Sequence, residues 1–93
     1  MELPINYDIA SPALRKKARE QYIKNQDGLC CYCGSSLEGE PNRKLLKVPI
    51  IKELFPVGFF RWPVHLHHSH ETGLTIGAVH SLCNAILWQY HGE

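Results

Sequence analysis

The chain lacks the features that would direct it into a membrane or out of the cell. None of its 93 residues belongs to a run approaching the roughly 20 apolar side chains that cross a bilayer. The N-terminal stretch MELPINYDIASPALRKK carries Glu2 and Asp8 and has no apolar segment of signal-peptide length. Repeats and low-complexity tracts are also absent. We therefore expect a cytoplasmic protein with no membrane partner, folded as a single domain over residues 1–93.

Positive charge is missing from the last third of the chain. All ten lysines and arginines lie between Arg15 and Arg61, and none follows from Trp62 onward, although the net charge is only +1. A histidine-rich neutral part joined to a basic part suits a metal centre beside a polyanion. A solvated basic face would explain the charge pattern equally well.

The chain is also too short to bury much apolar surface. Domains of this size often need a cross-link or a metal ion to offset the conformational entropy lost on folding. Four cysteines and six histidines could supply it, as disulfides or as metal ligands. Because cytoplasmic thiols stay reduced, metal ligation is the favoured interpretation.

Capping and turn residues predict a first helix over about residues 12–26. Ser11 can cap it, Pro12 suits its first turn, and Gly28 can end it. The apolar residues spaced for an inward face are Leu14, Ala18 and Tyr22.

Two strands and a helix are predicted near the C-terminus, which makes the fold class α+β. VHLHH (64–68) alternates like a half-buried strand, IGAVHSL (76–82) gives a second strand, and SLCNAILWQYH (81–91) reads as a helix capped by Ser81. Its inward side chains would be Leu82, Ala85, Ile86 and either Trp88 or Tyr90.

Residues 38–63 are the least readable part, with a short helix expected between Ile50 and Phe55. Phe59, Phe60 and Trp62 surround Arg61 in the stretch PVGFFRWP. We expect these rings to pack in the core, with a DNA-contacting loop as the alternative.

The cysteine spacing predicts a tetrahedral zinc site. Cys30 and Cys33 form a C-x-x-C turn followed by a glycine, and His80 and Cys83 form a second pair about fifty residues later. Zinc bound to such a Cys₃His set contributes roughly 10–16 kcal/mol of apparent folding free energy. Cys31 is a poorer ligand, expected as a small core or surface thiol. The alternative is a set of buried cysteines without metal.

The stretch VHLHHSH holds four of the six histidines. On a strand, His67 and His68 face opposite directions, so they cannot perform the same task. Asn84 follows Cys83 in the first turn of the last helix, where it could face the same point as His67 and share a second metal ion. His65 and His91 are expected to be structural or surface residues.

These motifs, in their order along the chain, resemble the HNH or ββα-metal nucleases. The segments that carry the resemblance are CCYCG and HLHHSHETGLTIGAVHSLCN, within about residues 28–87, and the phage recombination endonuclease VII family is the most similar group. The resemblance implies a small zinc-bound ββα-metal core with an N-terminal helix. It also suggests a phage or prophage origin, in which case the protein would act in the cytoplasm of the host cell.

The resemblance also implies roles for individual residues. His68 would be the general base that activates water, a task suited to an imidazole with a pKa of about 6.5. His67 and Asn84 would hold one divalent cation, usually Mg²⁺ in such enzymes, and His70 would lie near the scissile phosphate. The zinc ligands would be Cys30, Cys33, His80 and Cys83.

Two departures from the family pattern modify these expectations. His67 stands where the family usually has an aspartate, so we expect Mn²⁺, Co²⁺ or Ni²⁺ to support activity at least as well as Mg²⁺. The sequence ends at residue 93, nine positions after Asn84. We therefore expect a DNA nicking or double-strand endonuclease rather than a dedicated junction resolvase.

The sequence thus predicts a metal-dependent DNA endonuclease that contacts phosphates through basic side chains. A zinc-stabilised nucleic-acid-binding module without catalysis is the main alternative, and a nuclease acting on RNA is a weaker one. Phosphate contacts of this kind are salt-dependent and carry no sequence information. The candidate contacts are Arg15, Lys16, Arg19, Lys24 and Arg61, followed by Arg43, Lys44, Lys47 and Lys52.

Overall fold

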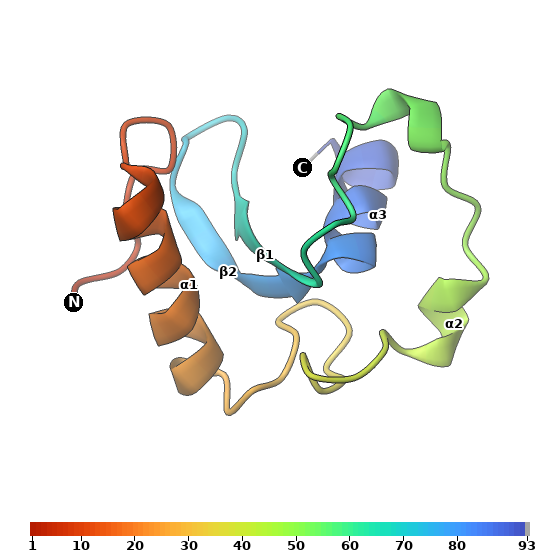
Figure 1. Ribbon diagram of the computed structural model, residues 1–93, viewed down its shortest axis with the longest axis horizontal. Coiled ribbons are helices and arrows are strands. Elements are labelled where there is room, and N and C mark those ends of the chain that lie inside the picture. The colour runs from red at the N-terminus through yellow and green to blue at the C-terminus, as the bar shows by residue number, and fades with distance from the viewer. Residues whose placement is uncertain (93) are drawn as a thin grey trace.

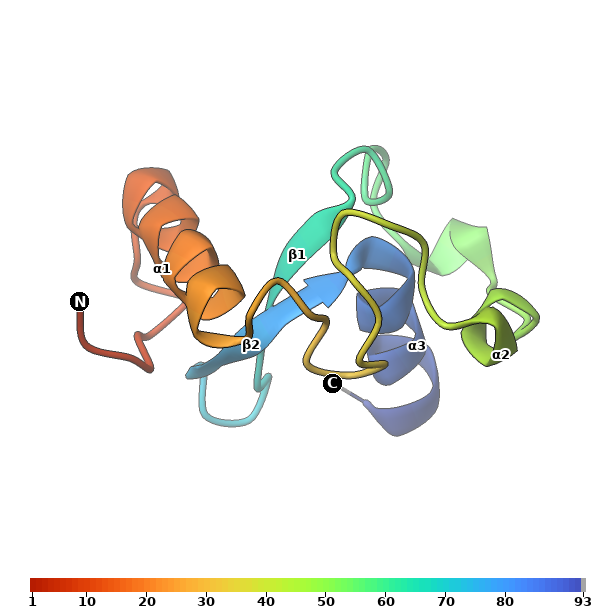
Figure 2. The ribbon, with the colours of Figure 1, turned by 90° about the horizontal axis from the view of Figure 1, so that it is seen from below.

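A computed structural model describes residues 1–92 as a small mixed α+β fold, so the predicted class is confirmed. Along the chain come α1 (Pro12–Asn25), α2 (Arg43–Leu46), the 3₁₀ helix η1 (Lys52–Leu54), β1 (Val64–His68), β2 (Thr75–His80) and α3 (Ser81–His91). The two strands lie between α1 and α3 (Figures 1 and 2). Within residues 1–92 no helix is long and apolar enough to cross a membrane.

Helix α1 forms where its capping residues predict it. The Ser11 hydroxyl accepts a hydrogen bond from the Leu14 amide at 3.1 Å, and the helix ends at Asn25 with Gln26 as its cap. Ala18 is buried as expected, and Tyr22 packs against the core. The inward placement of Leu14 is wrong, because α1 meets the core through its C-terminal half and leaves this first-turn side chain exposed.

The sheet is an antiparallel pair with one irregularity in its register. Val64 pairs with His80 and His67 with Gly77, but His68 pairs with Thr75, so the register skips Ile76. β1 has the predicted bounds, whereas β2 begins one residue earlier than predicted. It ends at His80 because the chain passes directly into α3.

Helix α3 spans the predicted residues, but its N-cap is His80 and the prediction of Ser81 is wrong. His80 has an extended backbone, whereas the Ser81 amide already lies in the helix and donates to the Pro63 carbonyl at 2.9 Å. The buried residues of α3 are Cys83, Ala85, Ile86 and Leu87, while Leu82 is half-buried.

The expected inward position of Trp88 or Tyr90 is also wrong, since both rings are exposed. The Tyr90 hydroxyl donates to the Pro49 carbonyl at 2.6 Å, and Gln89 bonds both that carbonyl and the Ile51 amide. These side chains therefore anchor the middle segment to α3 instead of filling the core.

The middle segment contains less helix than predicted around residues 50–55 and one helix that was not predicted. Only Lys52–Leu54 form a 3₁₀ turn, whereas the short helix α2 begins after Asn42, whose side chain accepts from the Lys44 amide. Phe59 is half-buried, whereas the Phe60 and Trp62 side chains are 36% and 68% exposed. The core position predicted for Trp62 is wrong, because Phe55, Phe59 and Phe60 pack on one another and Trp62 is left outside.

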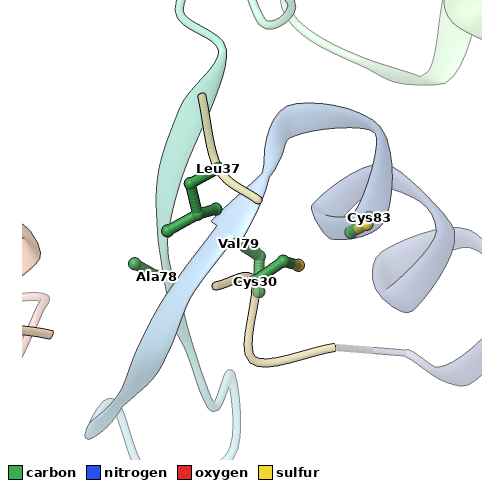
Figure 3. Close-up of a cluster of buried hydrophobic side chains, with 5 residues drawn as sticks. All are labelled: Cys30, Leu37, Ala78, Val79 and Cys83. Carbon is green, nitrogen blue, oxygen red and sulfur yellow. The ribbon is translucent and has the colours of Figure 1, made fainter. Parts of the chain in front are cut away.

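The core lies where the cysteine-rich turn meets β2 and α3, and it is small. At this meeting point Cys30, Leu37, Ala78, Val79 and Cys83 form a buried cluster (Figure 3), and the other buried apolar residues are Ala18, Leu66, Ala85, Ile86 and Leu87. Val79 and Cys83 are the largest side chains that are fully buried. So few large apolar side chains contribute little hydrophobic stabilisation, in line with the expectation that a metal or cross-link is needed.

The N-terminal segment lies beside the start of β2. The Thr75 amide donates to the Ile5 carbonyl at 3.0 Å, and the Tyr7 amide donates to the Gly73 carbonyl at 2.8 Å. This pairing places Tyr7 close to the end of β1, where the histidines lie.

Gln26 covers the outer edge of β2. Its Oε1 accepts from the Ala78 amide at 2.9 Å, and its Nε2 donates to the carbonyls of Ala78 at 3.0 Å and Leu29 at 2.7 Å. The Cys31 amide also donates to the Ala78 carbonyl at 3.1 Å. The backbone N–H and C=O groups of Ala78, at an otherwise open strand edge, therefore have hydrogen-bond partners. The same bonds join the end of α1 to the sheet.

We expect Gln26→Ala to lower the free energy of unfolding by about 1–3 kcal/mol, because it leaves the buried Ala78 amide without this acceptor. Urea denaturation of the metal-loaded protein would measure the change. Gln21→Ala is the matched control, since the Gln21 side chain donates to the exposed Asn25 side chain and does not bond the sheet within residues 1–92. Equal effects of the two substitutions would contradict this role for Gln26.

Candidate functional site

A tight turn presents Cys30 and Cys33 to the β2–α3 junction. The Gly34 amide donates to the Cys30 carbonyl at 3.0 Å, and the Cys30 amide donates to the Ser35 carbonyl at 2.8 Å. Gly34 has a φ of 78°, a conformation that side chains with a Cβ rarely adopt. The C-x-x-C-G spacing therefore produces the turn that it predicts.

Four side chains of the predicted zinc set come together at this junction. The ligand atoms of Cys30, Cys33, His80 and Cys83 all lie within 4.8 Å of one another. The Nδ1 atom of His80 is 3.4 Å from Cys33 Sγ and 3.6 Å from Cys83 Sγ. Tetrahedral zinc, with Zn–S of about 2.3 Å and Zn–N of about 2.0–2.1 Å, requires S–N separations near 3.6 Å. The group could therefore hold a zinc ion.

The second nitrogen of His80 supports this arrangement. Its Nε2 lies 2.8 Å from the Ser36 carbonyl oxygen, which can only accept a hydrogen bond. Nε2 must then carry the proton, and Nδ1 presents its lone pair to the three sulfurs. Metal-binding histidines commonly have such an outer hydrogen bond, which fixes both the tautomer and the ring orientation.

The surroundings of Cys30 favour its metal-binding thiolate form. A hydrogen bond from Cys83 lowers the pKa of the Cys30 thiol to about 4, and the same bond raises the pKa of Cys83. Thiolates are the form that binds metal, so Cys30 is already in that form near neutral pH. Cys31 lies outside the group and is exposed, as the sequence predicts.

A groove of about 1130 Å³ runs over β1, between α1 and the segment 54–63. Its lining includes three of the clustered histidines and the asparagine that follows Cys83, namely His65, His68, His70 and Asn84. The α1 side contributes Arg15, Lys16 and Arg19, and no aspartate or glutamate lines the groove. The groove is therefore cationic along one wall and carries imidazoles at its floor.

His68 is held in the groove by an aromatic stack. Its ring lies 3.8 Å from the ring of Tyr7 with an interplanar angle of 5°, and the Arg15 guanidinium lies 3.9 Å from the same Tyr7 centroid. Both groups cannot occupy one face at these distances, so Tyr7 lies between Arg15 and His68. The orientation of the His68 imidazole is thus fixed by packing.

The same environment keeps His68 neutral. Burial lowers its pKa, and the neighbouring His70, whose ring centroid is 4.9 Å away, lowers it further. Nearby Asp8 opposes the shift but does not reverse it. A neutral imidazole at the floor of the groove can accept a proton.

Asn84 is paired with His65. The Asn84 Nδ2 and His65 Nδ1 atoms are 3.1 Å apart, and the rings of His65 and Phe59 pack edge to face with their centroids 4.7 Å apart. His67 is only 3% exposed and does not line the groove. The sequence predicts a structural or surface role for His65, whereas the structure places it beside Asn84 in the lining of the groove. The strand alternation that places residues 65 and 67 on one face could have identified it.

The predicted phosphate contacts do not all lie together. Lys16 is exposed on the groove and Arg19 is half-buried there, whereas Lys24 and Arg61 do not line it. Lys24 lies instead in the last turn of α1, at a small hollow that is also lined by Met1, Lys17, Glu20 and Gln21. Arg15 donates to the Tyr7 carbonyl through Nε at 3.0 Å and through NH2 at 2.7 Å, so much of its donor capacity is used within the protein.

Comparison of the chain with protein-family models, with curated proteins and with solved structures gives no match.

We expect one zinc ion per chain by elemental analysis, and a large loss of zinc affinity and of thermal stability in Cys83→Ser. The substitution removes one of four ligands from a site that joins the turn to α3. Absorption of the Co²⁺-substituted protein would report tetrahedral thiolate ligation. Cys31→Ser is the control and should keep both the metal and the Co²⁺ spectrum; loss of the metal in this control would contradict the ligand set.

Proposed function

We propose that the chain is a divalent-cation-dependent DNA endonuclease of the ββα-metal type, with His68 as general base. The observation that carries the proposal is the groove, which collects His68, His70, His65 and Asn84 opposite the cationic wall of α1. Phosphodiester hydrolysis needs a base, a cation and a means of binding phosphate. The groove offers a candidate for each.

His68 supplies the base in this proposal. Its imidazole takes a proton from water, the water oxygen forms a bond to phosphorus, and the P–O ester bond to the leaving oxygen breaks. The leaving oxygen takes a proton from solvent. Support comes from the lowered pKa of His68 and from the Tyr7 stack that orients it. General-base catalysis of this kind contributes roughly 10²–10⁴ in rate.

Asn84 and a histidine would hold the catalytic cation. The resemblance implies His67 for this place, but the contact between Asn84 and His65 favours His65. Amide oxygen and nitrogen positions are interchangeable by a flip of the side chain, so Oδ1 can also face His65. Octahedral ligands at about 2.1 Å lie about 3.0 Å apart, and the observed separation is 3.1 Å. When bound, the cation would neutralise charge that develops on the phosphate.

The Cys₃His group would have a structural task in the same enzyme. A site with four protein ligands has no open position for substrate or water. The ββα-metal assignment is supported by an antiparallel pair that leads directly into α3, with Cys83 and Asn84 adjacent in its first turn. Zinc held by Cys83 would thereby fix Asn84 at the groove.

We expect zinc-loaded protein to nick supercoiled plasmid DNA, with Mn²⁺ at least as effective as Mg²⁺. His68→Ala should lower the rate at least about 100-fold, because the base is removed. Gel conversion of supercoiled to open-circular plasmid measures both effects. His91→Ala is the matched control, since His91 is exposed at the end of α3 and should not affect the rate.

Two results would contradict this proposal. Equal nicking by the wild type and by His68→Ala would exclude His68 as the base. DNA binding without nicking in any divalent cation would favour the zinc-stabilised binding module instead.

We further expect His65→Ala to raise the Mn²⁺ concentration for half-maximal nicking at least about tenfold, the scale of changes around metal ligands. His67→Gln should lower the melting temperature, because His67 is buried, while leaving the Mn²⁺ requirement nearly unchanged. Nicking titrations at a temperature where both variants are folded would separate the two effects. If His67→Gln alone raised the Mn²⁺ concentration for half-maximal nicking, His67 would be the cation ligand, as the resemblance implies.

A further inference from the structure

The wall of the groove opposite α1 is aromatic, and one of its rings is unusually exposed. Helix α1 and the segment 54–63 lie on either side of β1 (Figures 1 and 2). Phe55 packs against Phe59 at 4.8 Å and against Trp88 at 5.4 Å between ring centroids. Trp62 lines the same groove, is 68% exposed, and makes no ring–ring contact with any residue between 1 and 92.

We propose that this groove binds a single strand of DNA, with Lys16 and Arg19 contacting phosphates and the face of Trp62 stacking on a base. The inference rests on the proposed function, because it names the form in which DNA enters the nuclease groove. A flat, solvent-exposed indole opposite a cationic wall is the combination that binds unpaired strands. Two walls with these different chemistries suit a ligand that is anionic on one side and aromatic on the other.

Charge complementarity favours DNA as the occupant of the groove. The groove lining has three cationic side chains and no carboxylate. Arg15 is committed to the Tyr7 carbonyl, which leaves Lys16 and Arg19 available for phosphate. An apolar peptide in the groove would leave Lys16 and Arg19 without anionic partners. A purely anionic peptide would leave the Trp62 ring exposed to water.

The exposed indole selects a single strand over a duplex. In duplex DNA each base is stacked between its neighbours, so a protein ring can reach a base face only where a base is unstacked or unpaired. Stacking tolerates all four bases, since each has a π-face. We therefore expect little sequence preference at Trp62.

Binding can be measured without cleavage, using zinc-loaded protein in the absence of Mg²⁺ and Mn²⁺. Fluorescence anisotropy would compare a labelled oligothymidylate with a hairpin duplex of the same total length, at one fixed salt concentration. We expect the wild type to bind the single strand more tightly. Trp62→Ala should weaken single-strand binding roughly 5- to 150-fold, the scale of one base–aromatic stack, and should affect the duplex much less.

Matched variants separate stacking from charge and from folding. Trp62→Phe keeps an aromatic face and should retain most of the single-strand affinity. Arg19→Ala should weaken binding to both forms of DNA. Leu46→Ala removes an exposed apolar side chain that is outside the groove and should change neither affinity. Melting temperatures of all variants would verify that they are folded.

Three results would overturn the inference. Trp62→Ala could leave the single-strand affinity unchanged, or weaken both forms of DNA equally. Polyglutamate could bind as tightly as the oligothymidylate, which would show that the groove recognises charge alone. These outcomes are independent of plasmid nicking, so a protein that fails to cut but binds through Trp62 refutes the nuclease and leaves this inference intact.

Discussion

The contact between the cysteine turn and the β2–α3 junction determines where the other parts of the molecule lie. Cys30 and Cys33 approach His80 and Cys83 there, and four of the core's buried residues come from the same two segments. Because His80 ends β2 and Cys83 lies in the first turn of α3, the contact fixes the angle at which the helix leaves the sheet. Asn84 follows Cys83 directly, so its position over the groove is set by the same contact.

Much of this contact could be predicted from the sequence, because its signals are local. A C-x-x-C pair followed by glycine specifies a turn, and Ser11 and Pro12 specify the start of a helix. The bounds of β1 and α3 follow from alternation and from helical spacing. Where local signals conflicted, as at Ser81, the extended backbone imposed on His80 by the sheet decided which residue caps the helix.

The composition of the groove could not be predicted in the same way, because it depends on contacts between distant segments. Tyr7 reaches His68 only because residues 5–7 pair with the start of β2. The exposure of Trp62 depends on how Phe55 packs against Phe59 and against Trp88 on α3. The pairing of Asn84 with His65 depends on the angle between α3 and β1, which no sequence pattern states. The family resemblance implies that His67 is the cation ligand, because this residue stands where the family usually has an aspartate. Such a comparison of sequence positions does not indicate whether the side chain is buried.

The placement of Tyr7 and Asn84 has a consequence for synthesis of the chain. Tyr7 and Asn84, which are far apart in the sequence, line the same groove, and the cysteine turn binds metal together with His80 and Cys83 if the predicted zinc site is correct. A ribosome releases the chain from its N-terminus onward, so a nascent chain has α1, the turn and the cationic wall before it has α3. The lining of the groove is complete only when α3 emerges, because a chain that ends with β2 at His80 lacks both Asn84 and the third cysteine ligand, Cys83. A nascent chain that ends before α3 therefore has neither the complete Cys₃His group nor the complete lining of the groove.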